Sequence, residues 1–244
     1  MQYQFEQGEV LLINKPYRWT SFDVVGNLRG FLKAKLGIKK IKIGHAGTLD
    51  PLASGLLIVC TGKFTKQIDS YQGLEKEYTG TFFLGATTPS FDLETEINQR
   101  FSTEHLSDQL IFESAKRLTG ALEQTPPIYS AKKIEGKRAY KYARKDIEVI
   151  IKPRNISVSA FEITKIRLPE LDFRIVCSKG TYIRALANDF GKLTGCGAHL
   201  TALCRTRIGP YHLRDAFELD DLKKKILELK DETDRQDNGQ TSFK

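Results

Sequence analysis

The sequence predicts an α+β fold in which a central mixed or largely antiparallel sheet is flanked by helices. Short apolar runs of strand length are interspersed with longer segments whose apolar residues recur every three or four positions. The two kinds of segment interleave irregularly, which is typical of α+β domains. Hydrophobic residues make up 40% of the 244-residue chain, enough for a sizeable core.

The first predicted elements are a strand and a helix. Residues 8–14 (GEVLLIN) form a short apolar run that indicates a buried strand. Apolar residues then recur every four positions over 24–36, a spacing that predicts a helix. Thr20 or Ser21 can cap the start of this helix, and Gly37 can end it.

The remaining elements follow with turn-rich segments between them. Strands are predicted at 56–60, 78–84, 156–166 and 171–178, and helices at 106–118 and 182–193. No repeat, low-complexity linker or hinge divides the chain, so residues 1–230 are predicted to form one domain. A charged helix is expected from Leu222. Residues 231–244 are too polar to pack, and this tail is predicted to be disordered.

The charge of the chain indicates an anionic partner. Lys and Arg number 38 against 30 Asp and Glu, and the resulting net charge of +8 favours nucleic acid first. No apolar run reaches the roughly 18 residues of a membrane span, and the first residues lack a secretory signal. The four cysteines are too scattered for a disulfide framework. We therefore expect a cytoplasmic protein with no membrane partner.

A single carboxylate, Asp50, stands among small residues in the segment GHAGTLDPLASG. Pro51 pushes Asp50 out of the α region into an extended or turn conformation. A carboxylate on a glycine-bordered loop, backed by the apolar run 56–60, can meet a bulky ligand at close range. Spacing alone favours a second interpretation, in which Asp50 caps a helix that begins at Pro51.

This segment resembles the catalytic signature of the TruB family, the bacterial tRNA pseudouridine-55 synthases. The signature reads G-H-x-G-T/A-L-D-P-x-A-x-G, which is too long for a chance match. The residues that fit it are Gly44, His45, Gly47, Thr48, Leu49, Asp50, Pro51, Ala53 and Gly55. Further segments match the family in the same order, at 15–25, 77–78, 126–137, 177–184 and 195–205, so that the resemblance covers roughly residues 8–215.

The resemblance implies a pseudouridine synthase fold and the conversion of uridine 55, in the T-arm loop of tRNA, into pseudouridine. This reaction breaks the N1–C1′ bond, turns the uracil and rejoins it through C5. Water must be kept out because it would release the base, so one carboxylate suffices where a glycoside hydrolase uses two. Asp50 fits that role, either as nucleophile or as base. The uridine must flip out of its stack to reach it.

The resemblance also assigns partners to Asp50. An ionised carboxylate in a dry pocket needs a cation, and Arg184 is implied in that role. Tyr78 is implied to stack on the flipped uracil and to exchange the proton at C5. His45 resembles the family histidine that fills the space left in the RNA stack. From the residues alone, Arg184 can also be an arginine on a helix surface, and Tyr78 a tyrosine in the core.

Other residues are expected to bind the substrate. Leu203 and Tyr182 resemble pocket walls, and Lys15 resembles a family lysine beside the site. An RNA-gripping, thumb-like insertion is expected at about 124–150, where cations for phosphates alternate with tyrosines for bases. Its candidate RNA-binding residues are Lys132, Lys133, Lys137, Arg138 and Lys141. A second candidate patch comprises Lys33, Lys35, Lys39, Lys40 and Lys42, although charge runs are usually just solvated faces.

Two features depart from the family pattern. Arg18 stands where the family opening often has glycine, so the turn after Lys15-Pro16 is expected to differ. No C-terminal PUA domain is expected, which argues against the guide-RNA-dependent relatives. The resemblance implies tRNA as the partner, without a guide RNA, and a monomer. No cofactor or metal is expected, because Cys196, His199 and Cys204 lack the paired spacing of a zinc site.

Two other classes of function stay open. One is a catalytically silent tRNA-binding or folding protein on the same scaffold, which would have no need of Asp50, Tyr78 and Arg184 together. The other is a nucleoside hydrolase or base glycosylase that uses Asp50. Such a hydrolase would need a second carboxylate and a path for water, and no second carboxylate stands out in the matching segments.

Overall fold

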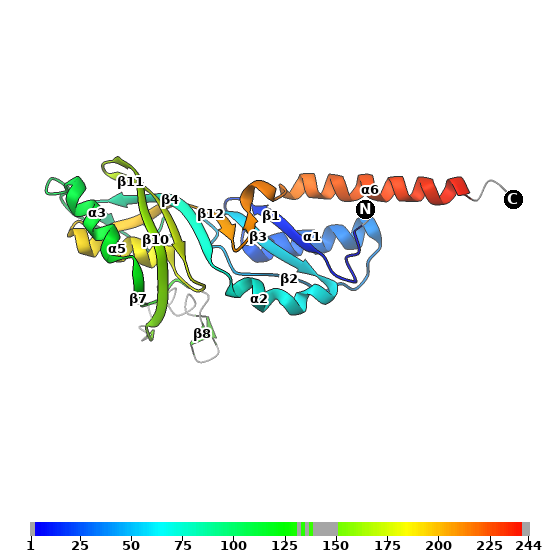
Figure 1. Cartoon of the computed structure of the whole chain (residues 1–244), viewed down its shortest axis with the longest axis horizontal. Coiled ribbons are helices and arrows are strands. Elements are labelled where there is room, and N and C mark those ends of the chain that lie inside the picture. Colours follow the sequence, from blue (N-terminus) through cyan, green and yellow to red (C-terminus); the bar gives the residue numbers. More distant parts are fainter. Residues whose placement is uncertain (1–2, 131–132, 135–136, 139–150, 241–244) are drawn as a thin grey trace. The chain divides into compact units, whose positions relative to one another are not determined.

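The computed structural model describes residues 3–130, 133–134, 137–138 and 151–240, with side chains for 3–130 and 151–232. It confirms the predicted α+β class, because helices flank the strands of a mixed sheet (Figure 1). The chain forms two compact units, Met1–Leu74 with Arg205–Lys244, and Glu75–Cys204. None of the helices in the described residues is both long and apolar enough to cross a membrane.

The first unit is built on three antiparallel strands. Strands β1 (Val10–Lys15) and β2 (Ile43–His45) both pair with β3 (Ala53–Thr61). The other elements of this unit are α1 (Ser21–Leu36), η1 (Gly62–Gln67), α2 (Ile68–Gly73), β13 (Tyr211–His212), η2 (Leu213–Asp215) and α6 (Leu219–Gln240). The strands predicted at 8–14 and 56–60 are confirmed as β1 and β3, and β3 is longer than predicted.

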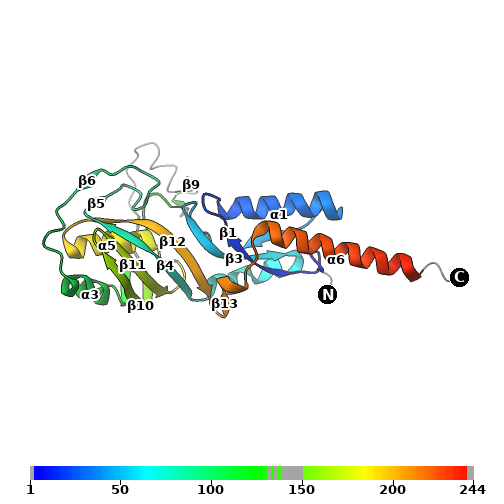
Figure 2. The ribbon, with the colours of Figure 1, turned by 90° about the horizontal axis from the view of Figure 1, so that it is seen from above.

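Helices cover both faces of these strands, because successive strand residues point to opposite sides. On one side α1 and α6 pack over residues such as Ile13 and Leu57. On the other side Ile58 packs with Ile68 and Tyr71, residues of α2. Figure 2 shows α1 and α6 running along this unit. The strands are therefore buried on both faces, which explains the continuous apolar runs in their sequence.

The ends of α1 are those predicted from the sequence. Thr20 is the N-cap and forms a capping box with Asp23. Gly37 ends the helix in the left-handed conformation, at φ 69°. The N-terminus of α1 is thereby fixed, and the residues before it are placed against the loop that carries Asp50.

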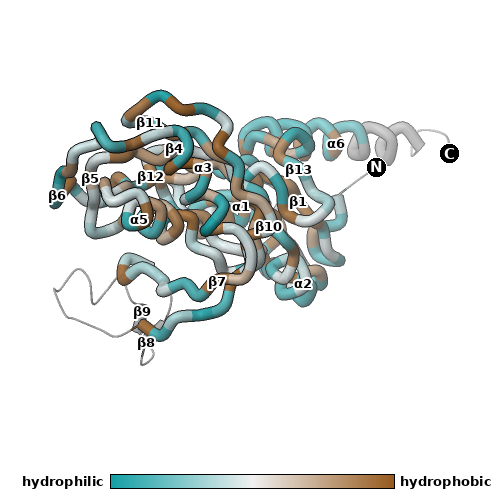
Figure 3. The backbone as a smooth tube through the Cα atoms, turned by 60° about the vertical axis from the view of Figure 1, so that its left-hand side comes forward, coloured by the Kyte–Doolittle hydropathy of each residue, from teal (hydrophilic) through white to brown (hydrophobic). Residues whose placement is uncertain are grey.

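Helix α6 differs from the prediction for the C-terminal tail. It continues to Gln240, whereas disorder is predicted from residue 231; residues 241–244 lie outside those described. Its described residues are mostly hydrophilic (Figure 3). Ion pairs between residues three apart, Lys223 with Asp220 and Lys224 with Asp221, support its first turns. The same turns bury Leu219, Leu222 and Ile226 in the core, so packing as well as ion pairs stabilises the start of the helix.

The second unit is an antiparallel sheet covered by helices on one face. Its strands follow the order β12, β4, β11, β10, β7. The strands are β4 (Lys76–Leu84), β7 (Gly120–Gln124), β10 (Arg154–Arg167), β11 (Glu170–Cys177) and β12 (Ala198–Ile208), whose last residues belong to the first unit. The helices are α3 (Asp108–Arg117) and α5 (Ile183–Thr194), and two short strands, β5 (Ala86–Thr87) and β6 (Gln99–Arg100), pair beside them.

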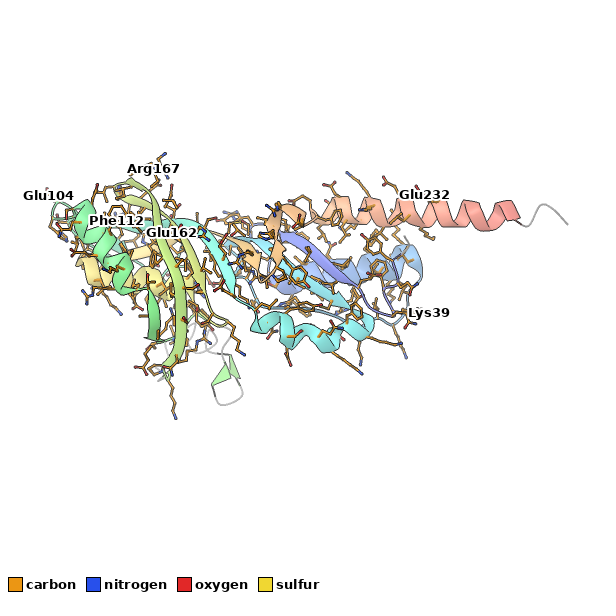
Figure 4. The ribbon with its side chains drawn as sticks, viewed as in Figure 1. Lys39, Glu104, Phe112, Glu162, Arg167 and Glu232 are labelled. Carbon is orange, nitrogen blue, oxygen red and sulfur yellow. The ribbon has the colours of Figure 1, made fainter. Side chains whose placement is uncertain are left out.

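The two faces of this sheet differ in character. Phe82, Phe161 and Phe173 pack against Phe190 of α5, so an aromatic core lies under this helix. The opposite face carries ion pairs across the strands, such as Arg174 with Glu77 and Glu162. Figure 4 labels Glu162 and Arg167 on β10. A sheet with one solvated face and one core face accounts for the alternating pattern of β11.

Candidate active site

Asp50 lies on the loop between β2 and β3, in the first unit. Pro51 and Leu52 form a turn, which the Ala53 N–H closes by donating to the Asp50 carbonyl oxygen at 3.1 Å. Strand β3 begins at Ala53. The interpretation of Asp50 as a helix cap is therefore wrong, because a strand and not a helix follows Pro51. The glycine-bordered loop backed by a buried strand is the arrangement found.

Backbone contacts fix this loop on either side of Asp50. The Leu49 N–H donates to the Ser21 hydroxyl at 2.9 Å, at the buried start of α1. The Pro51 carbonyl oxygen accepts from the Arg18 N–H at 2.8 Å. Asp50 itself is half-buried. Its carboxylate is thus carried by residues that cannot shift without breaking contacts to α1 and the turn before it.

The first of two buried cations at this loop is Lys15, which is fully buried. Its Nζ donates to the carbonyl oxygens of Pro16 at 2.9 Å, Trp19 at 2.6 Å and Pro51 at 3.4 Å. Three acceptors match the three donors of an ammonium group. Lys15 therefore ties the turn after β1 to the residue that follows Asp50, in keeping with its predicted place beside the site.

The second buried cation is Arg205, near the end of β12. Its Nε donates to the Leu56 carbonyl oxygen at 2.8 Å, and its Nη2 to the Gly47 carbonyl oxygen at 3.1 Å. These two carbonyl groups stand on either side of the Asp50 turn. Arg205 belongs to a segment that matches the family, but it was not among the predicted site residues. The only signal for it in the sequence was its place in that segment.

Lys15 and His45, two titratable basic groups near the loop, both have lowered pKa values. Burial lowers the pKa of Lys15 from 10.5 to about 8, against the attraction of the Asp50 carboxylate, which raises it. Burial also lowers the pKa of His45, and the Arg205 guanidinium lowers it further. His45, on β2, is therefore uncharged at neutral pH.

We expect the lowered pKa of Lys15 to make stability depend on pH. The unfolded chain holds this proton up to about pH 10.5, and the folded chain loses it near pH 8. Between these values the unfolded state binds more protons, so Lys15 makes the folded state relatively more stable as pH rises. Urea unfolding of wild type and Lys15→Met at pH 7.5 and pH 10 measures this effect. The wild-type free energy of unfolding should rise relative to the variant, and an unchanged difference would contradict the prediction.

Gly55 is expected to tolerate no side chain. Its φ is +106°, and a Cβ there would lie 2.4 Å from the Arg205 carbonyl oxygen. We expect Gly55→Ala to lower the free energy of unfolding by roughly 2 to 4 kcal/mol. Gly30→Ala, in the interior of α1 with open space around it, is the matched control and should stabilise by roughly 0.5 to 1 kcal/mol. Equal effects in urea unfolding would refute this account of the loop.

Arg184 lies near the start of α5, in the second unit, and is 2% exposed. Its Nη1 donates to the Ser90 carbonyl oxygen and its Nη2 to the Tyr129 carbonyl oxygen, both at 2.9 Å. The interpretation of Arg184 as a surface arginine is therefore wrong. Asp50 and Arg184 belong to different units, and their pairing stays a prediction.

Asp92 is a partner of Arg184 that was not among the predicted site residues. Its Oδ2 lies 3.3 Å from the Arg184 Nε, and both side chains are almost fully buried. Its Oδ1 accepts the Glu94 N–H at 2.9 Å. The loop also holds a residue other than glycine in the left-handed region, Phe91 at φ 64°. Arg184 thus joins a tight loop to the start of the predicted insertion at Tyr129.

The other predicted residues of the second unit lie on three elements. Tyr78 is buried on β4, in one row with Ile175 and Phe161, on the face that α5 covers. Tyr182 caps α5, and the Arg154 guanidinium carbon lies 4.6 Å from its ring centroid. Leu203 is half-buried on β12. Burial of Tyr78 fits a pocket or a core role equally.

Of the two predicted groups of RNA-binding cations, the structure describes the side chains of only one. Strands β8 (Lys133–Ile134) and β9 (Lys137–Arg138) pair as antiparallel strands, but their side chains, together with Lys132 and Lys141, lie outside the described residues. The second patch, over residues 33–42, is exposed at the C-terminal end of α1. The rise of α1 places Lys33 and Lys35 about 18 and 21 Å along the helix axis from Ser21, whose hydroxyl contacts Leu49.

Two family models and several curated relatives match this chain. The model of the TruB family pseudouridylate synthase N-terminal domain matches residues 33–183, and that of the tRNA pseudouridylate synthase B C-terminal domain matches residues 184–238. The chain is 56% identical to tRNA pseudouridine synthase B of Flavobacterium johnsoniae over 217 residues, which cover 88% of this chain and 95% of that protein. It is 52% identical to the Phocaeicola vulgatus protein of the same name over 216 residues, 88% and 92% of the two chains.

Solved structures share the fold. The chain resembles one in the crystal structure of a Cbf5-Nop10-Gar1 complex, with a TM-score of 0.68 and 28% identity over 90% of this chain. It also resembles one in the archaeal box H/ACA sRNP Nop10-Cbf5 complex, with a TM-score of 0.65 and 26% identity over 91% of this chain. The match covers 54% of each of those chains, so this chain spans about half their length. From these matches over most of its length, the chain belongs to the TruB family of pseudouridylate synthases.

Proposed function

We propose that this tRNA pseudouridine synthase acts on uridine 55 in the T-arm loop of tRNA. It flips the base out of its stack and exchanges the glycosidic bond with the help of Asp50. The observation that carries the proposal is the loop itself, where one carboxylate stands between backbone groups held by Ser21, Arg18 and Arg205. Relatives of nearly equal length named tRNA pseudouridine synthase B support it.

The proposed reaction uses one carboxylate and no water. The N1–C1′ bond breaks, the uracil turns, and a new bond joins C5 to C1′. The proton of C5 then leaves to solvent, and N1 takes up a proton, so the isomer has the same composition as uridine. Asp50 acts on the sugar either as nucleophile or as base. A rigid loop suits both roles, because a reacting group gains most when its position is fixed beforehand.

The remaining predicted residues serve this step in proposed roles. Arg184 pairs with the Asp50 carboxylate, while its contact with Asp92 orients the guanidinium. Tyr78 stacks on the uracil and exchanges the proton at C5. Tyr182 and Leu203 form the pocket walls, which exclude the water that would release the base. His45, neutral at pH 7, fills the space left by the flipped nucleotide.

We also propose how the enzyme works in the cell. It acts in the cytoplasm as a monomer, on tRNA alone, without a guide RNA, metal or cofactor. The predicted insertion at 124–150 contacts the T-arm. Purified protein freed of nucleic acid and treated with chelator should modify a pure tRNA transcript. A requirement for added RNA or metal would contradict this part of the proposal.

The position of modification is the direct test. Wild-type enzyme is incubated with an unmodified tRNA transcript and with the same transcript carrying cytidine at position 55. Pseudouridine is then mapped by carbodiimide adducts that stop reverse transcription. We expect a single stop immediately 3′ of position 55 in the first transcript and none there in the second. Free uracil would favour the base glycosylase, and bound but unchanged tRNA would favour the silent binding protein.

A further inference from the structure

The turn that leads into α1 is attached to the loop that carries Asp50. The Arg18 N–H donates to the Pro51 carbonyl oxygen at 2.8 Å. The buried Lys15 ammonium reaches the carbonyl oxygens of Trp19 and Pro51, at 2.6 and 3.4 Å. The backbone of this turn is therefore held beside the Asp50 loop, and the side chains of Tyr17 and Arg18 start from a fixed position.

Arg18 adopts a backbone conformation that suits glycine. Its φ is 68°, in the left-handed region where a Cβ crowds the backbone. Among the residues other than glycine that the structure describes, only Arg18 and Phe91 have a positive φ. Glycine adopts this φ without strain, and the expected difference in the turn stays a prediction. The difference that Arg18 makes is its side chain, and strain maintained beside a reacting group is a sign of function.

The side chains around Arg18 face solvent. Tyr17 is 50% exposed and Phe22 is 66% exposed. The Arg18 guanidinium carbon lies 5.7 Å from the centroid of the Tyr17 ring. The nearest acid in the sequence, Asp23, is held by the N–H and hydroxyl of Thr20 at 2.8 and 2.7 Å. One exposed ring thus lies against the Arg18 guanidinium, and a second exposed ring follows four residues later, in the first turn of α1.

We propose that Tyr17, Arg18 and Phe22 form a contact surface for the tRNA substrate, here termed the entry surface. Arg18 contacts a backbone phosphate, and the two rings contact bases next to the flipped uridine. The inference rests on the proposed function. Arginine suits a phosphate, and exposed rings suit the unstacked bases of an RNA loop. The entry surface adjoins the Asp50 loop, whereas the exposed lysines of 33–42 lie at the other end of α1.

The variant Arg18→Gly tests the side chain without adding strain, because glycine accepts a φ of 68°. We expect its Kd for unmodified tRNA, measured by fluorescence anisotropy at low salt, to rise roughly tenfold. The slope of log Kd against log salt concentration should fall by about one. KM should rise with Kd, kcat should stay unchanged, and the Tm should not decrease. Tyr17→Leu, which keeps apolar bulk and removes the ring, should raise Kd roughly fivefold.

The matched control is Arg214→Ala, which removes the same charge from an exposed site in the same unit. Its Kd should stay within about twofold of wild type. The inference is overturned if Arg18→Gly binds like wild type, or if both arginine variants weaken binding equally. A wild type that binds tRNA without forming pseudouridine refutes the proposed function, and the Kd comparison still decides the entry surface. A wild type that does not bind tRNA refutes both.

Discussion

Asp50→Asn is expected to lower the rate constant of pseudouridine formation by at least roughly 10⁴-fold. The amide keeps the size of the side chain but can act neither as nucleophile nor as base. The loop around it is held by backbone groups of Leu49 and Pro51, which the substitution leaves in place. Single-turnover assays with enzyme in excess over tRNA measure the chemical step free of product release.

The control for this prediction is Asp69→Asn, an exposed carboxylate of α2 in the same unit. Its rate constant should be that of wild type. Asp50→Asn should bind tRNA with a Kd within about threefold of wild type, because removing a negative charge does not weaken binding to an anionic RNA. A rate lowered only tenfold would mean that Asp50 assists the reaction without reacting itself.

Arg184→Met is expected to lower the free energy of unfolding by about 3 to 5 kcal/mol. The substitution leaves the Asp92 carboxylate buried without the cation 3.3 Å away. It also removes the donors to the carbonyl oxygens of Ser90 and Tyr129. Activity measured well below the melting temperature should fall as well, because the guanidinium is proposed to pair with Asp50. Urea unfolding and single-turnover rates separate the two losses.

A double-mutant cycle with Asp92 isolates the ion pair. Asp92→Leu alone should destabilise strongly, because it leaves the Arg184 charge buried. Together with Arg184→Met the loss should be smaller than the sum of the two single losses. Arg117→Met, on an exposed position of α3, should change the free energy of unfolding by no more than about 0.5 kcal/mol. If the two single losses in free energy of unfolding simply add in the double variant, the contact between Arg184 and Asp92 contributes nothing to stability.

Local signals in the sequence predicted the elements that support the Asp50 loop. A threonine cap, apolar residues four apart and a final glycine are enough to define α1. Pro51 suited both a turn and the first residue of a capped helix, so the sequence did not decide between them, and strand β3 at Ala53 excludes the cap. Strand β12 was missed, because its sequence AHLTALCRTRI places polar and basic residues where strand patterns have apolar ones.

Contacts between residues far apart in the chain could not be predicted in this way. Arg205 reaches the carbonyl oxygen of Gly47, 158 residues away, and Arg184 reaches that of Ser90, 94 residues away. Backbone carbonyl groups carry no sequence signal, so any residue type can accept such a bond. Asp92 likewise follows an ordinary turn-like stretch. These residues became visible only through the burial and the geometry of the structure.

Tritium release from a tRNA transcript labelled with [5-³H]uridine tests the central claim most directly. Forming the C5–C1′ bond expels the hydrogen of C5, so each turnover frees one tritium. We predict that wild-type enzyme releases one equivalent per tRNA, that Asp50→Asn releases none above background on the same timescale, and that both bind the transcript. Binding by wild type without release would contradict the enzyme function and leave a tRNA-binding protein in its place.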